Sequence, residues 1–417
     1  MNVLMKDLVT NGWRKQAILL SMVVMLTGLL FSRAFLSSGL ILFVVLTLIH
    51  KDIRPQLTIF FASPFLWGMT LLFLVPLISG LWSDDLSKWA EVIRIKLPLL
   101  LLPLCFAGLN NFGFKDWDKI AWAFLSIIVV GTGYSMWHYV QDISAVDAGY
   151  LRSHTIKTPV GNDHVRFSLL VTIGVQVIFF LLLNKHKQFS ITARFFLWIV
   201  MAGFVIYLHI LAVRTGLFCF YTGILIFLIW LLWNGKDKLK AALFLVILFS
   251  LPVISYFVFP TFKNRVSYLR YDLSFVKKDI YLPGSNDGNR IRSIKAGWDI
   301  QNNHPLTGVG FGDLEATTKE WYQLHHPEIN STDQILPSSE WMIYGAGSGW
   351  PGFIIFISMM LLPFSLKRLQ GNIFWWILNI SIALSYLFDI GLEVQYGVFV
   401  HGFILLWWYK RLLMERQ

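Results

Sequence analysis

The chain has 417 residues, of which 56% are hydrophobic, 16% are aromatic and only 14% are charged. Soluble proteins average about 25% charged residues, so the composition excludes an ordinary soluble domain and indicates an integral membrane protein. The net charge is +11, but the lysines and arginines are scattered between apolar segments and form no nucleic-acid-binding patch. We therefore expect membrane lipids, and no nucleic acid, as partners. Cys105 and Cys219 lie inside apolar segments and are expected to be small buried residues.

About twelve windows of about 20 apolar residues are long enough to cross a hydrocarbon core. They centre near Val24, Leu42, Gly68, Leu102, Val130, Val175, Phe204, Leu225, Phe249, Phe356, Ser381 and Phe403. The window at Leu102 is short and carries Pro98 and Pro103, which makes it the candidate for a broken or re-entrant span. The pattern predicts an all-α, polytopic bundle of about 12 spans with one large, partly helical loop.

The basic residues of the short connections predict the orientation of these spans, because cytoplasmic loops carry an excess of Lys and Arg. With the N-terminus inside, the inner connections hold Lys51, Arg54, Lys115, Lys119, Lys185, Lys187, Arg194, Lys236, Lys238, Lys240, Lys367, Arg368, Lys410 and Arg411. The outer connections hold carboxylates and isolated basic residues, among them Arg33, Arg94, Lys96, Arg152, Arg166 and Arg214. An even number of spans then places both termini inside.

The segment from Phe262 to Ala346 is polar, basic and aromatic, and it is too long for a simple connection. Ordered connections of this length are usually functional. We therefore divide the chain into spans 1 to 9 over residues 1–261, an outer loop that holds the catalytic residues over 262–346, and spans 10 to 12 with the C-terminus over 347–417.

Residues 289–299 of this loop have the period of an amphipathic helix, with Ile291, Ile294 and Trp298 as its expected buried stripe. The turn formers of 283–289 place Arg290 in the first helical turn, where the free N–H groups and the helix dipole favour anions. Further along, Gly308, Gly310 and Gly312 permit close backbone passage, but the sequence lacks the Gly-Lys-Ser/Thr ending of a phosphate-binding P-loop.

Arg214 joins two long apolar segments with almost no loop between them, and Arg166 opens another span three residues after Asp163. Both arginines therefore sit at helix mouths, where an Arg can snorkel to the interface or bind an anionic ligand. Local pairing with Asp163 is an alternative account of Arg166. No cluster of His, Asp and Glu has the short spacing of a zinc or calcium site, so we expect no metal and no other cofactor.

The chain resembles the O-antigen ligase and O-polysaccharide polymerase superfamily of polytopic membrane proteins. The residues that carry the resemblance are Arg214-Thr215-Gly216 at a helix mouth, Arg290-Ile291 in the loop helix, the run Asn303-His304-Pro305-Leu306-Thr307-Gly308-Val309-Gly310-Phe311-Gly312, and Gly345 to Gly352. The resemblance implies a glycosyltransferase that moves a glycan from undecaprenyl diphosphate to a lipid A-core or similar glycan acceptor. It further implies inversion at the anomeric carbon, no metal, and a bacterial inner membrane protein with a periplasmic active site.

Two other functions stay open. A polymerase of the same superfamily would join one carrier-linked glycan to another, and the sequence does not separate it from a ligase. A transporter or flippase would carry ionisable groups at the membrane midplane. The charges of this chain lie mostly at span ends, as Asp389 and Glu393 do, which makes transport the less favoured alternative.

Family members usually carry a His-Asn pair at the end of the loop, and the histidine is the candidate base for the acceptor hydroxyl. Here Ser338-Ser339 stands in that place, and serine is no general base at neutral pH without a second base beside it. Glu340 is the first alternative base, and His325 and His326 follow. Glu340 could instead cap the helix that begins near it.

Cleavage of a sugar–phosphate bond places negative charge on a diphosphate, which guanidinium groups hold by bidentate contacts. We therefore assign catalysis to Glu340, His326, His325, Arg214 and Arg290. Substrate binding is assigned to Arg166, Arg292, Arg94, Trp298 and Ser338. Trp298, Trp321 and Trp341 suit stacking on sugar rings, although tryptophans also anchor spans at the membrane interface.

Overall fold

We used a computed structural model of the chain, which describes residues 2–50, 53–159, 163–185, 189–235 and 238–416. Every regular element in these ranges is helical. Lys51, Lys187 and Lys236, which the sequence places in inner connections, lie outside the described residues. The all-α class expected from the sequence is therefore confirmed.

The N-terminal part begins with two packed helices and continues through short helices. They are α1 (Asn2–Phe31), α2 (Arg33–Leu48), α3 (Ile53–Ala62), α4 (Pro64–Met69), α5 (Leu71–Ser79), α6 (Leu86–Lys96) and α7 (Pro98–Ala107). Pro64 and Pro98 each occupy the first turn of their helix, where the missing N–H costs no hydrogen bond. The prolines therefore divide this apolar stretch into short pieces.

Longer helices form the middle of the bundle. They are α8 (Phe114–Gln141), followed by α9 (Ile143–Gly149) and the 3₁₀ turn η1 (Tyr150–Arg152), and then α11 (His164–Lys185), α12 (Ile191–Leu211), α13 (Arg214–Asn234) and α14 (Lys238–Val258). Ala212, in the left-handed conformation, ends α12, and Arg214 starts α13 two residues later. This tight turn holds Arg214 at the helix mouth that the sequence indicates.

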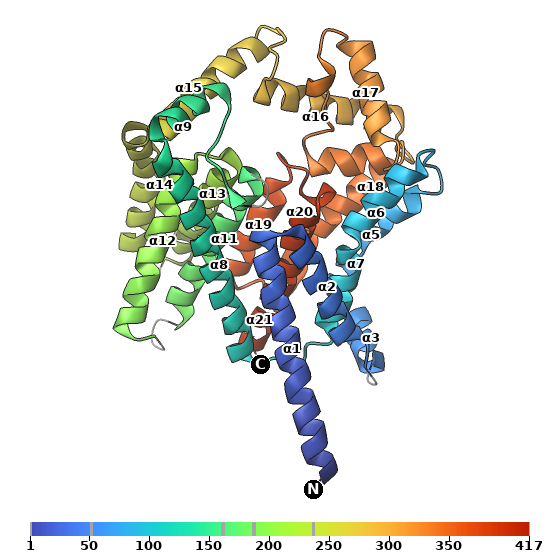
Figure 1. The fold of residues 1–417 in the computed structure, drawn as a ribbon, viewed down its shortest axis with the longest axis vertical. Helices are drawn as coiled ribbons and strands as arrows, with labels where there is room; N and C mark the ends of the chain where they lie inside the picture. The colour runs from blue at the N-terminus through green and yellow to red at the C-terminus, as the bar shows by residue number, and fades with distance from the viewer. Residues whose placement is uncertain (1, 51–52, 160–162, 186–188, 236–237, 417) are drawn as a thin grey trace.

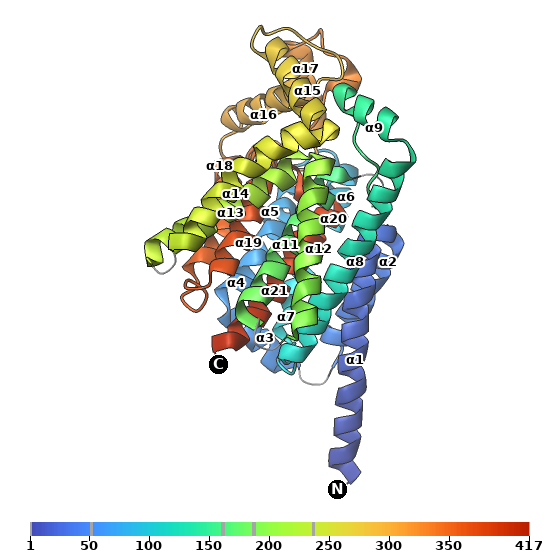
Figure 2. The same ribbon diagram turned by 90° about the vertical axis from the view of Figure 1, so that its left-hand side faces the viewer.

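A polar layer, which we call the cap, covers one end of the bundle (Figures 1 and 2). It consists of α9, α15 (Pro260–Val276), α16 (Asn286–Asn303), α17 (Leu314–His325) and the 3₁₀ turn η2 (Ser331–Asp333). The polar segment 262–346 is thus partly helical, and it starts inside α15 and ends inside α18 (Glu340–Ser365). Helix α1 begins, and the C-terminal helix ends, at the opposite end of the bundle (Figure 1).

The chain returns from the cap through α18 and ends in broken helices. After α19 (Ile373–Ser385) come the 3₁₀ turn η3 (Gly391–Glu393), α20 (Gln395–Phe399), the π-helical turn η4 (Val400–Ile404), α21 (Leu405–Leu413) and the 3₁₀ turn η5 (Met414–Arg416). Helix α18 is itself interrupted at Ser348 and Gly349, where the backbone dihedrals are not helical.

Within the described ranges, seven helices are long and apolar enough to cross a membrane, and the number is eight if α2 and α3 count as one span. They correspond to the expected windows at Val24, Val130, Val175, Phe204, Leu225, Phe249 and Phe356. The other five windows form shorter or broken helices; prolines and the π-helical turn interrupt several of them. The total of about 12 spans therefore stays a prediction.

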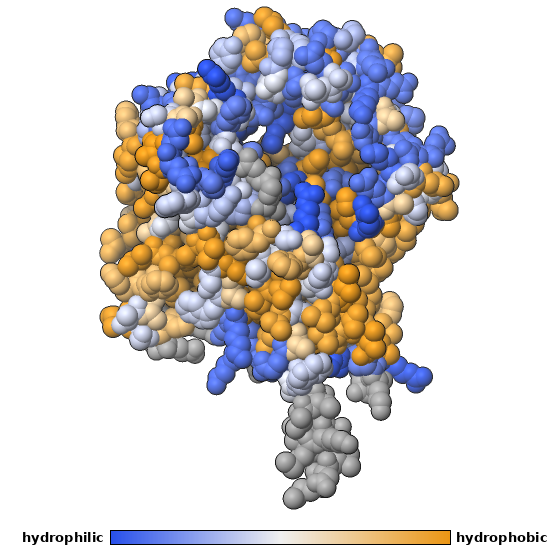
Figure 3. All heavy atoms as spheres, viewed as in Figure 1, coloured by the Kyte–Doolittle hydropathy of each residue, from blue (hydrophilic) through white to orange (hydrophobic). Residues whose placement is uncertain are grey.

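The surface supports a multi-pass membrane protein. On the face shown in Figure 3, a broad band of hydrophobic residues crosses the bundle, whereas the cap is mostly hydrophilic. Large side chains such as Trp233 and Phe257 are exposed within the apolar helices, which is favourable only against lipid. The two cysteines are free and buried, as expected.

Helix α16 differs from its expected orientation. Ile291 and Trp298 are 47% and 45% exposed, so the predicted buried stripe was wrong. The buried face instead carries small residues such as Ser293, Ala296 and Gly297. A Cβ atom at Gly297 would come within 2.8 Å of Met342. Close packing of α16 on α18 therefore outweighed the burial of the larger apolar side chains.

The glycine-rich segment after α16 runs along the break in α18. Val309 N–H donates to Ala346 O at 2.9 Å, and Gly310 N–H donates to Gly347 O at 3.0 Å. Gly308 and Gly310 have φ values of 65° and 89°, in a region that favours glycine. The close passage that the glycines predict is therefore against α18, and it fixes the cap to the bundle beside α5 and α6.

Candidate active site

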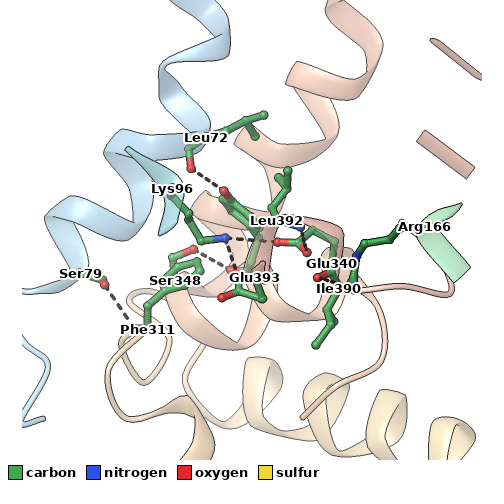
Figure 4. Close-up of polar contacts among 11 residues, drawn as sticks. Leu72, Ser79, Lys96, Arg166, Phe311, Glu340, Ser348, Ile390, Leu392 and Glu393 are labelled. Carbon is green, nitrogen blue, oxygen red and sulfur yellow. Dashed lines mark hydrogen bonds and ion pairs between the residues drawn. The ribbon is translucent and has the colours of Figure 1, made fainter. Parts of the chain in front are cut away.

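Three buried charged side chains meet beneath the cap, each from a different part of the chain (Figure 4). Lys96 Nζ lies 2.6 Å from Glu393 Oε1 and 3.4 Å from Glu340 Oε1. The side chains of Lys96 and Glu340 are fully buried, and that of Glu393 is 12% exposed. We call these residues the Lys96 triad.

The ends of three helical elements position the triad. Lys96 ends α6, Glu340 begins α18 after the N-cap Ser339, and Glu393 ends the turn η3. Glu340 N–H donates to the carbonyl oxygens of Tyr386 and Asp389, at 3.0 and 3.2 Å. The start of α18 is thereby fixed to the segment that leads to η3.

Aromatic rings and a backbone amide complete the surroundings of the triad. The Lys96 ammonium lies 5.4 Å from the ring centroid of Phe311 and 5.0 Å from that of Tyr344, within the range of cation–π attraction. Leu392 N–H donates to Glu340 Oε2 at 3.0 Å. Lys96 is thus the cationic partner of both carboxylates. Such pairing matters because buried charges are energetically costly unless they are paired and hydrogen-bonded.

Arg166 lies beside the triad at the start of α11. It forms ion pairs with Asp163 and with Asp389, the latter at 3.1 Å, and it donates to Ile390 O at 3.1 Å. Its Nε is buried and has no partner among the described residues. Arg166 therefore keeps one unused donor despite its two carboxylate neighbours.

A cavity of about 760 Å³ opens next to the triad and Arg166, and we call it the groove. Its walls come from α1, α2, α6, α7, the start of α11 and residues 393–396. Arg33, Arg94, Arg166, Glu393 and Tyr396 lie on these walls. Arg33 and Arg94 are exposed and have no ion-pair or hydrogen-bond partner in the described part of the chain.

The groove changes character along its length. Arg33 starts α2, and Leu40, Ile41 and Val44 follow it along that helix. Arg94 lies in the last turn of α6, and it is followed by Leu97, before α7, and by Leu101, within α7. Charged groups therefore lie near the cap, and apolar groups line the deeper part. Tyr396 also lines the groove, and its hydroxyl is buried without a partner among the described residues. A charged headgroup joined to an apolar chain fits this arrangement.

A second group of arginines lies under the cap and consists of Arg214, Arg265 and Arg290, which we call the cap arginines. Arg214 forms an ion pair with Asp287, and Arg290 donates to Phe388 O at 2.9 Å. Burial and the nearby charge of Arg214 lower the pKa values of both Arg265 and Arg290. The charges of Asp389 and Arg166 also act on the pKa of Arg290, so Arg166, which lines the groove, is near this cap arginine as well.

The structure brings some of the proposed catalytic residues together and places others apart. Arg214 and Arg290 lie together beneath the cap, near Arg166. Glu340 is fully buried and reaches the groove only through Lys96 and Glu393. His325 stacks on Trp321 at the end of α17, and His326 contacts Glu328. The described contacts link neither histidine to the groove or to an arginine of the site.

The proposed substrate-binding residues are also divided. Arg94 and Arg166 line the groove. Arg292 is buried, donates to Ile280 O at 3.3 Å and packs over the ring of Tyr281. Trp298 faces outward and contacts Trp350. Ser338 is half-buried, and its backbone N–H donates to Ser293 Oγ.

Sequence reasoning did not assign a role to Lys96, Arg265, Glu393 or Tyr396. A signal existed for two of them: Lys96 is a basic residue at an outer span end, and Glu393 is an acidic residue near another. Ionisable groups at such depths are functional candidates by default. Nothing in the sequence indicated that these two residues meet, because 297 residues separate them.

Comparison with known families identifies one segment. Residues 199–357 match the family model described as O-antigen ligase. The match runs from within α12 to within α18 and includes Arg214, Arg265, Arg290 and Glu340. It confirms the resemblance found in the sequence. No curated protein matches the chain.

Proposed function

We propose, from the premise that residues 199–357 belong to the O-antigen ligase family, that the protein transfers a glycan from undecaprenyl diphosphate to a lipid A-core or similar acceptor. The reaction is an inverting displacement at the anomeric carbon. The protein resides in the bacterial inner membrane, and its cap faces the periplasm. Basic connections at the opposite end, such as those of Lys115, Arg368 and Lys410, support this orientation.

The groove is the observation that carries this proposal. A polyprenyl diphosphate has a long apolar chain and a strongly anionic head. The groove offers an apolar wall on α2 and α7 below Arg33 and Arg94, which have no partner in the described part of the chain. Its volume of about 760 Å³ is in the range of ligand sites. The isoprenyl chain lies along Ile41, Val44 and Leu101, and the diphosphate lies near Arg94 and Arg166.

The arginines stabilise the negative charge of the leaving diphosphate. As the sugar–phosphate bond breaks, negative charge grows on the diphosphate, and fixed guanidinium groups stabilise that charge more in the transition state than in the bound donor. Arg94 approaches from the groove, and Arg214 and Arg290 approach from the cap. Arg166 lines the groove and has a buried Nε without a partner among the described residues, so it supplies a further donor to the diphosphate.

A polymerase remains the second candidate, and the presence of two groups of arginines is compatible with it. A polymerase binds two carrier lipids, each with a diphosphate, so it needs two cationic regions near one reaction centre. The groove and the cap arginines supply two such regions, and Arg166 is near both. A ligase can use the same two regions for its donor and for a phosphorylated acceptor.

Transfer can be measured with purified protein in nanodiscs and a lipid extract from a strain that lacks this chain. Such an extract holds both accumulated donor and acceptor. We expect the protein to release undecaprenyl diphosphate and to form a heavier glycolipid, both detected by mass spectrometry. Absence of both products with correctly folded protein would refute the proposed function.

A surface-glycan gel of the same deletion strain separates the two candidates. Free core without a ladder of repeats indicates a ligase, because completed polymer is then never attached. Core that carries a single repeat indicates a polymerase. Re-expression of the chain should restore the full ladder in either case.

A further inference from the structure

The Lys96 triad is unusual in its charge balance and in its location. One lysine faces two carboxylates in a buried setting, and only one of the three residues, Glu393, lines the groove. The other carboxylate, that of Glu340, is fully buried and accepts hydrogen bonds from Leu392 N–H and from the Lys96 ammonium. Of the triad, Glu393 alone is a lining residue of the cavity that Arg94 and Arg166 also line. Figure 4 shows the three triad side chains with Arg166 beside them.

We propose that Glu393 is the general base that accepts the proton of the acceptor hydroxyl, and that Lys96 and Glu340 are positioning residues. This inference rests on the proposed glycan transfer and adds the group that replaces the loop histidine. Glu393 meets three requirements together: it borders the proposed donor site, it is hydrogen-bonded to Lys96, and it is partly open to the cavity. Asp163 also lines the groove, but its carboxylate is paired with Arg166, which the proposed function assigns to the diphosphate.

The step balances in atoms and charge. The acceptor oxygen forms a bond to the anomeric carbon while the bond from that carbon to the phosphate oxygen breaks. The electron pair of the broken bond leaves with the diphosphate, whose charge the arginines hold. The hydroxyl proton passes to the Glu393 carboxylate, which later releases it to water. No further reactant is required.

The contacts of the triad explain why Glu393 is held in place. Lys96 is bound on its far side by Glu340 and by the rings of Phe311 and Tyr344, so it presents its ammonium from a fixed direction. Glu340 also accepts the N–H of Leu392, the residue directly before Glu393. Glu340 thus orients both Lys96, which is the hydrogen-bond partner of the base, and the turn η3, which carries the base.

Charged groups lie on several sides of Glu393. Besides its partner Lys96, they are Glu340 across the lysine and, along the groove, Arg33, Glu91, Arg94, Asp163 and Arg166. A general base must be unprotonated to act, so we expect the transfer rate of the unchanged protein to rise with pH and then level off.

The test compares Glu393→Gln with the unchanged protein. Glutamine keeps an oxygen that accepts from Lys96 but is no base, so we expect the transfer rate with the lipid extract to fall by about 10² to 10⁴. The rise of rate with pH should disappear in this variant. Binding of geranylgeranyl diphosphate, used as a probe of the diphosphate site, should stay within about twofold, and Glu393→Asp should recover part of the rate.

A matched control removes a different lysine-paired carboxylate. Asp116 forms an ion pair with Lys15 at 2.6 Å near the opposite end of the bundle, so Asp116→Asn should keep the rate and its pH profile. A Glu393→Gln variant that transfers at the normal rate, or that loses rate only in proportion to its thermal stability or probe binding, would overturn the assignment of the base. The proposed function would still stand in that case, because it fails only if the unchanged protein releases no undecaprenyl diphosphate.

The positioning roles have their own readout. Lys96→Met and Glu340→Gln should lower the maximal rate and shift the pH profile while the affinity for geranylgeranyl diphosphate is retained. If these variants change thermal stability alone and leave the pH profile of the remaining activity unchanged, Lys96 and Glu340 are structural and the positioning assignment is wrong.

Discussion

The two groups of arginines near the proposed reaction centre differ in how they are held. Arg33 and Arg94 stand exposed on the wall of the groove without partners among the described residues. Arg290 and Arg265 lie under the cap, where burial and the charge of Arg214 lower their pKa values. Arg214 is further tied to Asp287. Arg33 and Arg94 are thus exposed, whereas Arg265 and Arg290 are partly desolvated and Arg214, although 37% exposed, is held by its ion pair.

This difference separates binding from catalysis. A hydrated, mobile cation gains little from contact with an anion, because water and salt screen the charge. A fixed guanidinium in a drier setting is already oriented toward the developing charge, and its interaction is stronger there. We therefore assign capture of the donor mainly to Arg33 and Arg94, and stabilisation of the leaving diphosphate mainly to Arg214 and Arg290.

The largest effect is expected for the cap arginines. Arg290→Ala and Arg214→Ala should each lower the transfer rate by about 10² to 10³, the usual cost of losing one fixed donor to a developing oxyanion. Arg214→Lys should rescue poorly, because an ammonium does not reproduce the guanidinium fork. The rate is measured as undecaprenyl diphosphate release. Near-normal release by both alanine variants would remove the cap arginines from the mechanism.

A smaller effect is expected in the groove, and in affinity more than in rate. Arg33→Ala and Arg94→Ala should each weaken binding of geranylgeranyl diphosphate by up to about tenfold, the worth of one charge-assisted hydrogen bond at a wet site. The maximal rate should change less than the affinity does. Titration calorimetry in nanodiscs measures the affinity. A loss confined to the maximal rate would contradict the division of roles.

Salt should distinguish the two groups further. Raising the ionic strength from about 0.1 M to about 1 M shortens the Debye length from about 10 Å to about 3 Å and screens exposed charges first. Binding of geranylgeranyl diphosphate should therefore weaken with salt in the unchanged protein and in Arg290→Ala. The Arg33→Ala/Arg94→Ala double variant should show the shallowest salt dependence. Equal slopes in all three proteins would argue against different exposure of the two groups.

The smallest effect on transfer is expected for Arg292, although it shares a helix with Arg290. Its contacts with Ile280 and Tyr281 lie within the cap, so Arg292→Ala should change the transfer rate by less than about threefold. Thermal stability should fall instead, because the Ile280 carbonyl loses its donor. A large loss of transfer at unchanged stability would restore Arg292 to the substrate site.

The sequence determined the class of the protein and much of its outline. Hydrophobic windows identified the seven long apolar helices, because the length of a span is a local property of about 20 residues. The position of Arg214 at a helix mouth and the close passage at the glycines of 308–312 could also be predicted. A tight turn and a close backbone passage each depend on the types of a few neighbouring residues.

The orientation of α16 shows where local pattern failed. Its apolar residues predicted a buried stripe, yet Ile291 and Trp298 point outward, and small residues face α18. Periodicity reports which residues share a helix face, but the partner surface decides which face is buried. Here the close approach to Met342 and Pro337 at Gly297 decided it.

Only the tertiary structure decided the composition of the proposed site. Lys96 lies 244 residues before Glu340 and 297 before Glu393 in the chain, and no local pattern encodes a meeting over such separations. Their contact depends on packing that brings the end of α6, the start of α18 and the end of η3 together beneath the cap. Because solvent access is low there, each charged side chain needs a partner of opposite charge. Glu340 could thus be named from the sequence, whereas its place behind Lys96 and Glu393 follows from packing alone.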